Sequence, residues 1–302
     1  MGSNSWRAGL VAGALVIAQG AGQGSAAAAA RVNVPCNTAA LVTAINTANG
    51  AGSPQTLNLA ASCTYNLTTA AASGTRGDDG LPIITGNITL VGNGTTIRRV
   101  SASLFRLLEV TGTLGVRGLL LRDGDVGLNP GGGILSAHGI VAITSSTIYG
   151  NVADNGAGVA NDRGRVTFTN SVVRNNTTLP RLGGGGGGVY NDGTMTLTSS
   201  RVTFNHANTD GGGVYNELTG KLTVTASQLQ ANTASDQGGG LFNGTNGAAA
   251  FTNSTVQFNT ADDGGGIYNA TCRCSITLKN TSVTVNQPNN CRPVGSVAGC
   301  VG

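Results

Sequence analysis

Short runs in which every second residue is hydrophobic recur along most of the chain, and they predict β-strands. Typical runs are Met195–Leu197, Leu222–Val224 and Ile276–Leu278. Alternation of this kind places successive side chains on opposite faces of a strand, one toward a core and one toward solvent. The spacing of an amphipathic helix is nearly absent after residue 50. We therefore expect an all-β protein.

A glycine-rich motif and an asparagine motif recur in phase with these runs. The first reads GGGVYN at 186–191 and at 211–216, and the third glycines of its six copies are separated by 25, 30, 25, 27 and 26 residues. The second is an apolar residue three positions before an asparagine, as in Val202–Asn205. A fixed period of this length identifies a repeat protein. The recurrent asparagines form two sets, Asn151, Asn176, Asn205, Asn232, Asn259 and Asn286, and Asn161, Asn191, Asn216, Asn243 and Asn269.

Each period holds three strand signals with no hairpin turn or helix between them, which favours a coil that winds round and stacks on itself. Each strand would pair in parallel with its counterpart one repeat along, about 4.8 Å away. An antiparallel sandwich or propeller would instead need hairpin turns between strands. We predict a right-handed parallel β-helix of about 8–9 coils, stacked to share one core. The expected inward columns are Val189, Val214, Leu241 and Ile267; Phe168, Leu197, Val224, Phe251 and Leu278; and Ile148, Val173, Val202, Leu229, Val256 and Val283.

The two ends of the chain differ from the repeats. Residues 37–49 carry a helical pattern with an Asn or Thr cap, and Gly50 would end the helix. We expect this helix to cover the open end of the β-helix. The predicted organisation is a signal peptide over 1–30, an N-terminal cap and first coil over 31–80, repeats over 81–286 and a disulfide-closed cap over 287–302.

The first thirty residues predict export. Trp6 and Arg7 precede an apolar run over 8–18 and a tail of small residues that ends at Ala30. This order is typical of a signal peptide, and we expect cleavage near residues 27–30. The apolar run is too short for a membrane span, and no later run is long enough. The mature protein is therefore expected to be secreted, extracellular and without a membrane span.

Six cysteines lie at the two ends of the mature chain, and an even count in an exported protein favours disulfides. Cys36 with Cys63 is the natural N-terminal pair. The four C-terminal cysteines allow three connectivities, of which we favour one. The alternative is a zinc site made of those four thiolates, although their spacing fits no common zinc motif. The favoured C-terminal pairs are Cys291 with Cys300 and Cys272 with Cys274.

Composition and charge agree with stacked coils. Of 302 residues, 49 are Gly, while 17 are basic and 13 are acidic. Like charges placed above one another on successive coils would repel, so a stacked chain disfavours charge. The net charge of +4 is too mild to suggest nucleic acid as a partner.

The motifs resemble a known group of repeat proteins. The glycine motif GGGVYN and the apolar-x-x-Asn motif are similar to the GGAI and FxxN repeats of chlamydial polymorphic outer-membrane proteins. They resemble still more closely the secreted actinobacterial proteins with right-handed parallel β-helix repeats, in which a Cys–Leu–Ile cap (Cys36, Leu41, Ile45) and a Pro-Asn-Asn-Cys tail (288–291) frame the repeats. The resemblance covers nearly all of residues 32–302. It implies a fold shared with pectate-lyase-like enzymes and does not specify an activity.

An arginine-rich region is the first candidate for function. Arg122, Tyr149 and Arg174 would occupy one outward position on successive coils. An Arg–Asp groove on a β-helix face resembles the way polyuronate lyases hold an acidic sugar, where a basic side chain removes a proton. The alternative is a set of solvated surface arginines. The candidate catalytic residues are Arg117, Arg122, Asp123 and Asp125, with Tyr149 and Arg174 as candidate binding residues.

Two further columns could bind a ligand. An aromatic column could stack sugar rings if it faces outward, or be structural if it packs under a loop. An acidic column after the asparagines could bind Ca²⁺ through carboxylate oxygens, or simply end turns before glycine; no cofactor is required. The aromatic column is Tyr190, Tyr215, Phe242 and Tyr268, and the acidic candidates are Asp210, Asp236, Asp262 and Asp263.

Two hypotheses follow for the activity. In the first, the protein is a non-catalytic, adhesin-like molecule that binds a polysaccharide or cell-surface glycan along an extended face. In the second, it is a polysaccharide lyase or glycoside hydrolase acting on an acidic polysaccharide. A cleft with one convergent Arg/Asp/Tyr cluster would favour the enzyme, and uniform columns without a cleft would favour the binder.

Overall fold

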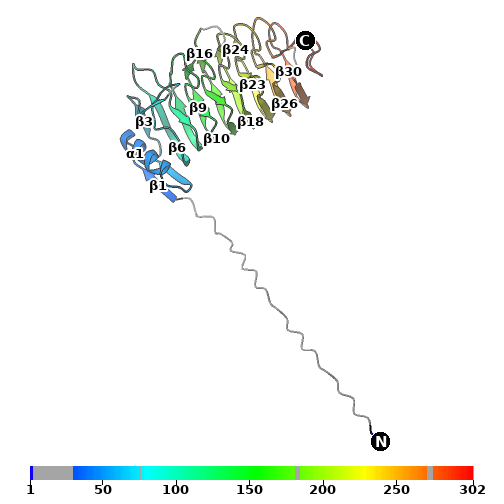
Figure 1. Ribbon diagram of the computed structural model, residues 1–302. Helices are drawn as coiled ribbons and strands as arrows, with labels where there is room; N and C mark the ends of the chain where they lie inside the picture. The colour runs from blue at the N-terminus through cyan, green and yellow to red at the C-terminus, as the bar shows by residue number, and fades with distance from the viewer. Residues whose placement is uncertain (3–29, 75, 181–183, 271–274, 302) are drawn as a thin grey trace.

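A computed structural model describes residues 1–2, 30–74, 76–180, 184–270 and 275–301. Over this range the chain forms a parallel β-solenoid of about nine turns. Figure 1 shows the coils following one another from helix α1 (Thr38–Asn49) to the C-terminus. The prediction of an all-β parallel coil with a helix near its N-terminus is confirmed.

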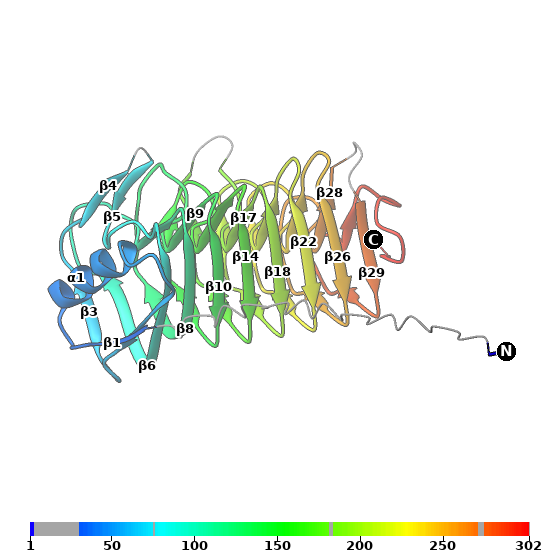
Figure 2. The same cartoon turned by 60° about the horizontal axis from the view of Figure 1, so that its bottom comes forward.

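Three columns of parallel strands form the long sides of the solenoid. The strands of the first face lie side by side in Figure 2, from the α1 end to the C-terminal end. Strands β6 (Asn87–Arg99) and β8 (Thr113–Arg122) are long enough to belong to both the first and the second face. The first face also contains β1 (Ala30–Val34), β2 (Gln55–Leu59), β10 (Ile140–Thr144), β14 (Arg165–Thr169), β18 (Thr194–Thr198), β22 (Lys221–Thr225), β26 (Ala248–Thr252) and β29 (Ser275–Lys279).

The other two faces have shorter strands. The second face contains, besides β6 and β8, strands β3 (Thr64–Leu67), β11 (Thr147–Tyr149), β15 (Val172–Arg174), β19 (Arg201–Thr203), β23 (Gln228–Gln230), β27 (Thr255–Gln257) and β30 (Ser282–Thr284). The third face contains β7 (Leu108–Val110), β9 (Ile134–Ala137), β13 (Val159–Asp162), β17 (Val189–Asn191), β21 (Val214–Asn216), β25 (Leu241–Asn243), β28 (Ile267–Asn269) and β31 (Cys291–Arg292).

Two small sheets were not predicted. One is a column of two-residue strands, β12 (Val152–Ala153), β16 (Thr177–Thr178), β20 (His206–Ala207) and β24 (Thr233–Ala234). The other is the antiparallel pair β4 (Ala72–Gly74) and β5 (Gly77–Asp79). Both are too short to show a period-two pattern, so the sequence gives no sign of them.

Strands pair in register, and identical chemistry lies above identical chemistry. Val166 pairs with Met195, which pairs with Leu222, and all three are buried. The predicted inward columns are buried as expected except at Leu278, which is partly exposed and packs against the core. Each coil thus contributes a few side chains to one continuous hydrophobic core.

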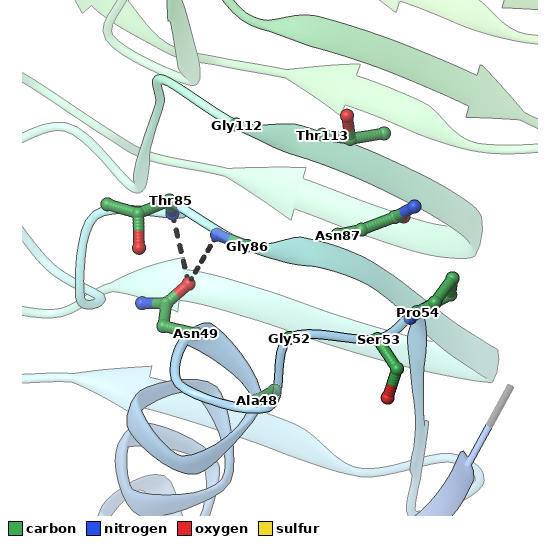
Figure 3. A pocket seen from close by; sticks show the side chains of 10 residues that line it. All are labelled: Ala48, Asn49, Gly52, Ser53, Pro54, Thr85, Gly86, Asn87, Gly112 and Thr113. Atoms are coloured by element: carbon green, nitrogen blue, oxygen red, sulfur yellow. Dashed lines mark hydrogen bonds between the residues drawn. The ribbon is translucent and has the colours of Figure 1, made fainter.

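Helix α1 closes the N-terminal end. Asn37 caps it by accepting a hydrogen bond from the backbone N–H of Ala40 (3.1 Å), and Leu41, Ile45 and Ala48 are buried against the first coils. At its last turn Asn49 is bonded to the chain of the next coil (Figure 3). Its side-chain oxygen accepts hydrogen bonds from the backbone N–H groups of Thr85 and Gly86 at 3.0 and 3.1 Å.

Disulfides hold both ends. Cys36 is bonded to Cys63 and Cys291 to Cys300, as predicted. Cys272 and Cys274 lie outside the described residues, as does nearly all of the predicted signal peptide. Within the part of the chain that the structure describes, no helix combines the length and the hydrophobicity needed to cross a membrane.

The repeated glycines occupy one corner of the coil. The first glycine of each motif, as at Gly211 (φ +66°), has a left-handed conformation that favours glycine. The third approaches the next coil so closely that a Cβ on Gly213 would lie 2.7 Å from the carbonyl oxygen of Gly240. The composition therefore follows from backbone geometry at one recurring place.

Buried polar ladders connect the coils. The side-chain amide of Asn205 donates to the side-chain oxygen of Asn232 (3.0 Å), and its own oxygen accepts from Asn176 (2.9 Å). The second set of asparagines is linked in the same way, as between Asn191 and Asn216 (2.8 Å). These asparagines are buried and hydrogen-bonded to one another, so their role is structural. A third, serine ladder was not predicted and consists of Ser146, Ser171, Ser200, Ser227 and Ser254.

One charged cluster lies inside the N-terminal coils. The Arg106 side chain is completely buried and donates hydrogen bonds at 2.9 Å to the carboxylates of Asp79 and Glu109. It also donates to backbone carbonyl oxygens, including that of Gly77 (3.4 Å). Burial raises the pKa of Asp79 to about 6 against the opposing effect of Arg106.

Candidate functional site

A tyrosine held between two arginines stands on the second face. Tyr149 of β11 pairs in register with Arg122 on one side and Arg174 on the other. The guanidinium carbon of Arg122 lies 5.1 Å from the centre of the Tyr149 ring, and that of Arg174 lies 4.9 Å from it. Both distances are typical of cation–π contacts. The three residues thus lie in register on successive coils, with the Tyr149 ring between the two guanidinium groups.

The acidic candidates beside this stack are bound to arginines. An oxygen of the Asp123 carboxylate lies 2.7 Å from Nε of Arg122. Oδ2 of Asp125 lies 3.6 Å from Nη2 of Arg99. The Asp125 carboxylate also accepts a hydrogen bond from the backbone N–H of Gly127 (3.0 Å). Both carboxylates therefore balance neighbouring positive charge.

Arg117 lies elsewhere. It is exposed on the first-face part of β8, where it pairs with Val91 and Thr144. Gly118 follows it with a left-handed backbone (φ +65°), and Arg122 belongs to the second face. Arg117 and Arg122 therefore lie on different faces of the solenoid, while Asp123 and Asp125 follow the end of β8.

The aromatic column forms a stacked stripe on the third face. Ring centres are 5.7 Å apart between Tyr190 and Tyr215, 4.7 Å between Tyr215 and Phe242, and 5.5 Å between Phe242 and Tyr268. All four residues are half-buried. The backbone of Gly185 lies against the Tyr215 ring, since a Cβ there would come within 2.2 Å of it. The stripe is thus partly covered by a glycine-rich loop and partly open. We name these four residues the aromatic stripe.

A pocket of about 400 Å³ adjoins the N-terminal end of the aromatic stripe. Carboxylates reach it from the ends of three consecutive third-face strands, β13, β17 and β21, and an arginine reaches it from between β4 and β5. We call it the stripe-end pocket. Its charged and aromatic lining residues are Arg76, Asp162, Arg163, Tyr190, Asp192 and Glu217.

The charges in the stripe-end pocket are coupled. Asp162 forms an ion pair with Arg76, while Arg163 lies 3.8 Å from Asp162 and 3.5 Å from Asp192. Burial raises the pKa of Glu217, against a lowering effect of its hydrogen bond with the Tyr215 hydroxyl. Burial, and next the nearby Glu217 charge, raise the pKa of Tyr190.

The sequence does contain a signal for this pocket. An acid directly follows the ladder asparagine in three consecutive coils, as Asp162, Asp192 and Glu217, and Gly244 takes this place in the next coil. Arg76, however, comes from outside the repeat, and nothing in the period places it there.

The predicted acidic column lines a shallow hollow with Gln237. The carboxylate of Asp263 is held by Nε of Arg292 (2.8 Å) and by the side-chain amide of Asn289 (3.2 Å). Within the described residues, no three Asp, Glu, His or Cys side chains converge so that they could hold a metal ion. This geometry offers no support for calcium at Asp210, Asp236, Asp262 or Asp263.

Asp210 is expected to make stability depend on pH. Burial, with a smaller contribution from Asp236, raises its pKa to about 6 from an ordinary value of 3.8. Asp210 therefore binds its proton more tightly in the folded protein than in the unfolded chain. The resulting contribution to the free energy of unfolding is complete below pH 3.8 and is lost as pH rises through 6. Urea unfolding at pH 4 to 7 should show the wild type losing stability relative to Asp210→Asn as pH rises. A difference that stays constant or grows with pH would contradict this expectation.

A hollow of about 480 Å³ beside helix α1 is of a different kind (Figure 3). Its lining consists of small or uncharged residues, among them Gly52, Ser53 and Thr113. Figure 3 shows the Asn49 side chain directed toward Thr85 and Gly86, to whose backbone N–H groups its oxygen is already bonded. It therefore presents no convergent reactive groups.

Comparison with known proteins identifies no relative. No protein-family model, no curated protein and no solved structure matches the chain significantly. The functional argument consequently rests on the geometry of this chain.

Proposed function

We propose that the chain is a secreted β-helix repeat protein that binds an acidic polysaccharide on its second face without catalysis, as a surface-binding, adhesin-like protein. The Arg122–Tyr149–Arg174 stack carries this proposal. Guanidinium groups form strong paired hydrogen bonds with carboxylates, and a tyrosine ring adds an amphipathic surface for a sugar. The stack thus offers cationic and aromatic contacts on adjacent coils.

Neighbouring residues extend this surface. Arg98 pairs in register with Arg122 one coil earlier; on the coil beyond Arg174 the register position is Thr203, and exposed Arg201 lies two residues away, paired with Val172. Coils are about 4.8 Å apart, so positive charge is repeated along the direction in which a polymer would lie. Carboxylates repeated along a polysaccharide would meet this row of charges.

The chain ends support the secreted part of the proposal. Two disulfides are compatible with an oxidising, extracytoplasmic compartment. Residues 1–30 have the order of a signal peptide. We assign the repeats, on their sequence motifs, to the actinobacterial group with chlamydial-like GGAI and FxxN repeats.

Calorimetric titration with polygalacturonate and alginate tests the proposal, with a neutral glucan for comparison. We expect binding of the acidic polymers that weakens as salt rises. Arg174→Met should lower the affinity about tenfold, since a charged hydrogen bond contributes about 1.5–3 kcal/mol. Arg165→Met, which removes an exposed arginine of the first face, is the matched control and should bind normally. Equal loss of acidic-polymer binding in both variants, or acidic-polymer binding that does not weaken as salt rises, would refute the proposal.

A polysaccharide lyase or hydrolase is the second candidate function, favoured by Asp123 lying beside the stack. Against it, the Asp123 carboxylate is bound to Arg122 at 2.7 Å. Incubation with the same polymers, with and without Ca²⁺, distinguishes the two functions. Release of unsaturated sugars or of new reducing ends by the wild type, and its loss in Asp123→Asn, would show that the protein is an enzyme and would overturn the proposal of binding without catalysis.

A further inference from the structure

The aromatic stripe ends where the stripe-end pocket begins. In the register of the third face, Tyr268, Phe242, Tyr215 and Tyr190 occupy one outward position on successive coils. The next two coils place Ala160 and Leu135 at that position. Both of these residues, with Tyr190, line the pocket. The pocket therefore lies on the side of Tyr190 where the stack of rings stops.

One face of the Tyr190 ring is left without a stacked neighbour in the described chain. Its other face stacks on Tyr215 with an interplanar angle of 18°. Ala160 and Leu135 are almost completely buried (1% and 0% exposed), whereas Tyr190 is half-buried and lines the pocket. A ligand ring in the pocket would therefore lie against the exposed part of Tyr190.

The polar groups around this place are acceptors and donors at fixed positions. The side chains of Asp162 and Asp192 are only 14% and 17% exposed, so their carboxylates are held by the fold. Arg163, by contrast, is 70% exposed and has a left-handed backbone (φ +54°).

The charge pattern of the pocket argues for a particular chemical class. Carboxylates stacked at the same place on three coils repel one another, and Arg76 and Arg163 compensate only two of them. An anionic sugar would add to this repulsion. A neutral sugar would donate its hydroxyl hydrogens to the carboxylates and accept from Arg163, while its ring face covers Tyr190.

We infer that the stripe-end pocket is a second carbohydrate-binding site, which takes one ring of a neutral sugar against Tyr190, with hydroxyl groups bound by Asp192, Glu217 and Arg163. This site is separate from the acidic-polysaccharide surface, because it lies on the third face and carries carboxylates. The protein would then hold two chemically different glycans on two sides of one rigid solenoid.

Titration of the full chain with neutral gluco-, manno-, xylo- and N-acetylglucosamine oligosaccharides tests the inference. At least one series should bind, and Tyr190→Ala should weaken it at least tenfold. Asp192→Asn, which keeps the shape of the side chain, should weaken it several-fold without changing the fold. Phe242→Ala is the matched control, because it removes a ring from the same stripe two coils away and should leave the affinity unchanged.

The two sites must respond independently. Tyr190→Ala should retain binding of acidic polymers, and Arg174→Met should retain binding of the neutral oligosaccharide. Absence of binding by all neutral series would overturn the inference, as would an equal loss in Tyr190→Ala and Phe242→Ala. Binding of calcium or an oligoamine in the pocket, with no sugar bound, would also overturn it and define a cation site instead.

Discussion

Replacing Arg106 by methionine is expected to lower the free energy of unfolding by about 3–5 kcal/mol, because it leaves Asp79 buried without its cation. The Asp79 and Arg106 side chains are both 0% exposed and are joined at 2.9 Å. Methionine fills a similar volume but satisfies neither the carboxylate nor the carbonyl oxygen of Gly77. Denaturation in urea at pH 7, followed by circular dichroism, measures the effect.

Two further variants identify the cause. Arg201→Met removes an exposed arginine of the second face and should change stability by less than about 0.5 kcal/mol. The double variant Asp79→Asn with Arg106→Met should recover part of the lost stability, because it removes the buried charge. If the single and double variants are equally unstable, the loss comes from packing rather than from the unpaired carboxylate.

Removing one asparagine in the middle of a ladder is expected to cost about 2–4 kcal/mol, since two or more buried groups lose their partners. Asn205 accepts from both the backbone N–H and the side-chain amide of Asn176, and it donates to the carbonyl oxygen of Val173 and to Asn232. Asn205→Ala breaks all four hydrogen bonds in the core. The free energy of unfolding in urea, together with amide hydrogen exchange around Val173, measures the loss.

Gln230→Ala is the matched control for this ladder variant. Gln230 lies on the second face, pairs with Thr203 and is half-exposed. Gln230→Ala should change the free energy of unfolding by less than about 0.5 kcal/mol. A similar cost for both variants would show that the ladder contributes no more than an ordinary outward side chain.

The fold was predictable because each coil repeats the same requirements. The glycine at the corner, the buried asparagine and the alternating strand recur at one phase, so register follows from the sequence alone. In the N-terminal coils the motifs are weaker, and Arg106 meets Asp79 through a bridge between neighbouring coils. Nothing in the period predicts that pairing, or the strand β1 that precedes helix α1.

The candidate sites were predictable only where their residues occupy the same position in successive repeats. Arg122, Tyr149 and Arg174 are in phase, and they meet as expected. Arg117 is only five residues before Arg122, yet a left-handed Gly118 follows it and the two belong to different faces. The stripe-end pocket needs Arg76, whose position depends on the irregular segment between β4 and β5.

Both asparagine ladders run in one direction, each amide donating toward the coil that follows, as from Asn205 to Asn232. Each junction that a ladder crosses, from Asn151 and Asn161 onward, therefore presents the same donor on one side and the same acceptor on the other. A duplicated or deleted coil would restore the junction that it interrupts, so the number of coils can change in evolution without any redesign of the core. The protein can in this way become longer or shorter by whole units, and the distance between its two ends is a variable that selection can adjust independently of its surfaces.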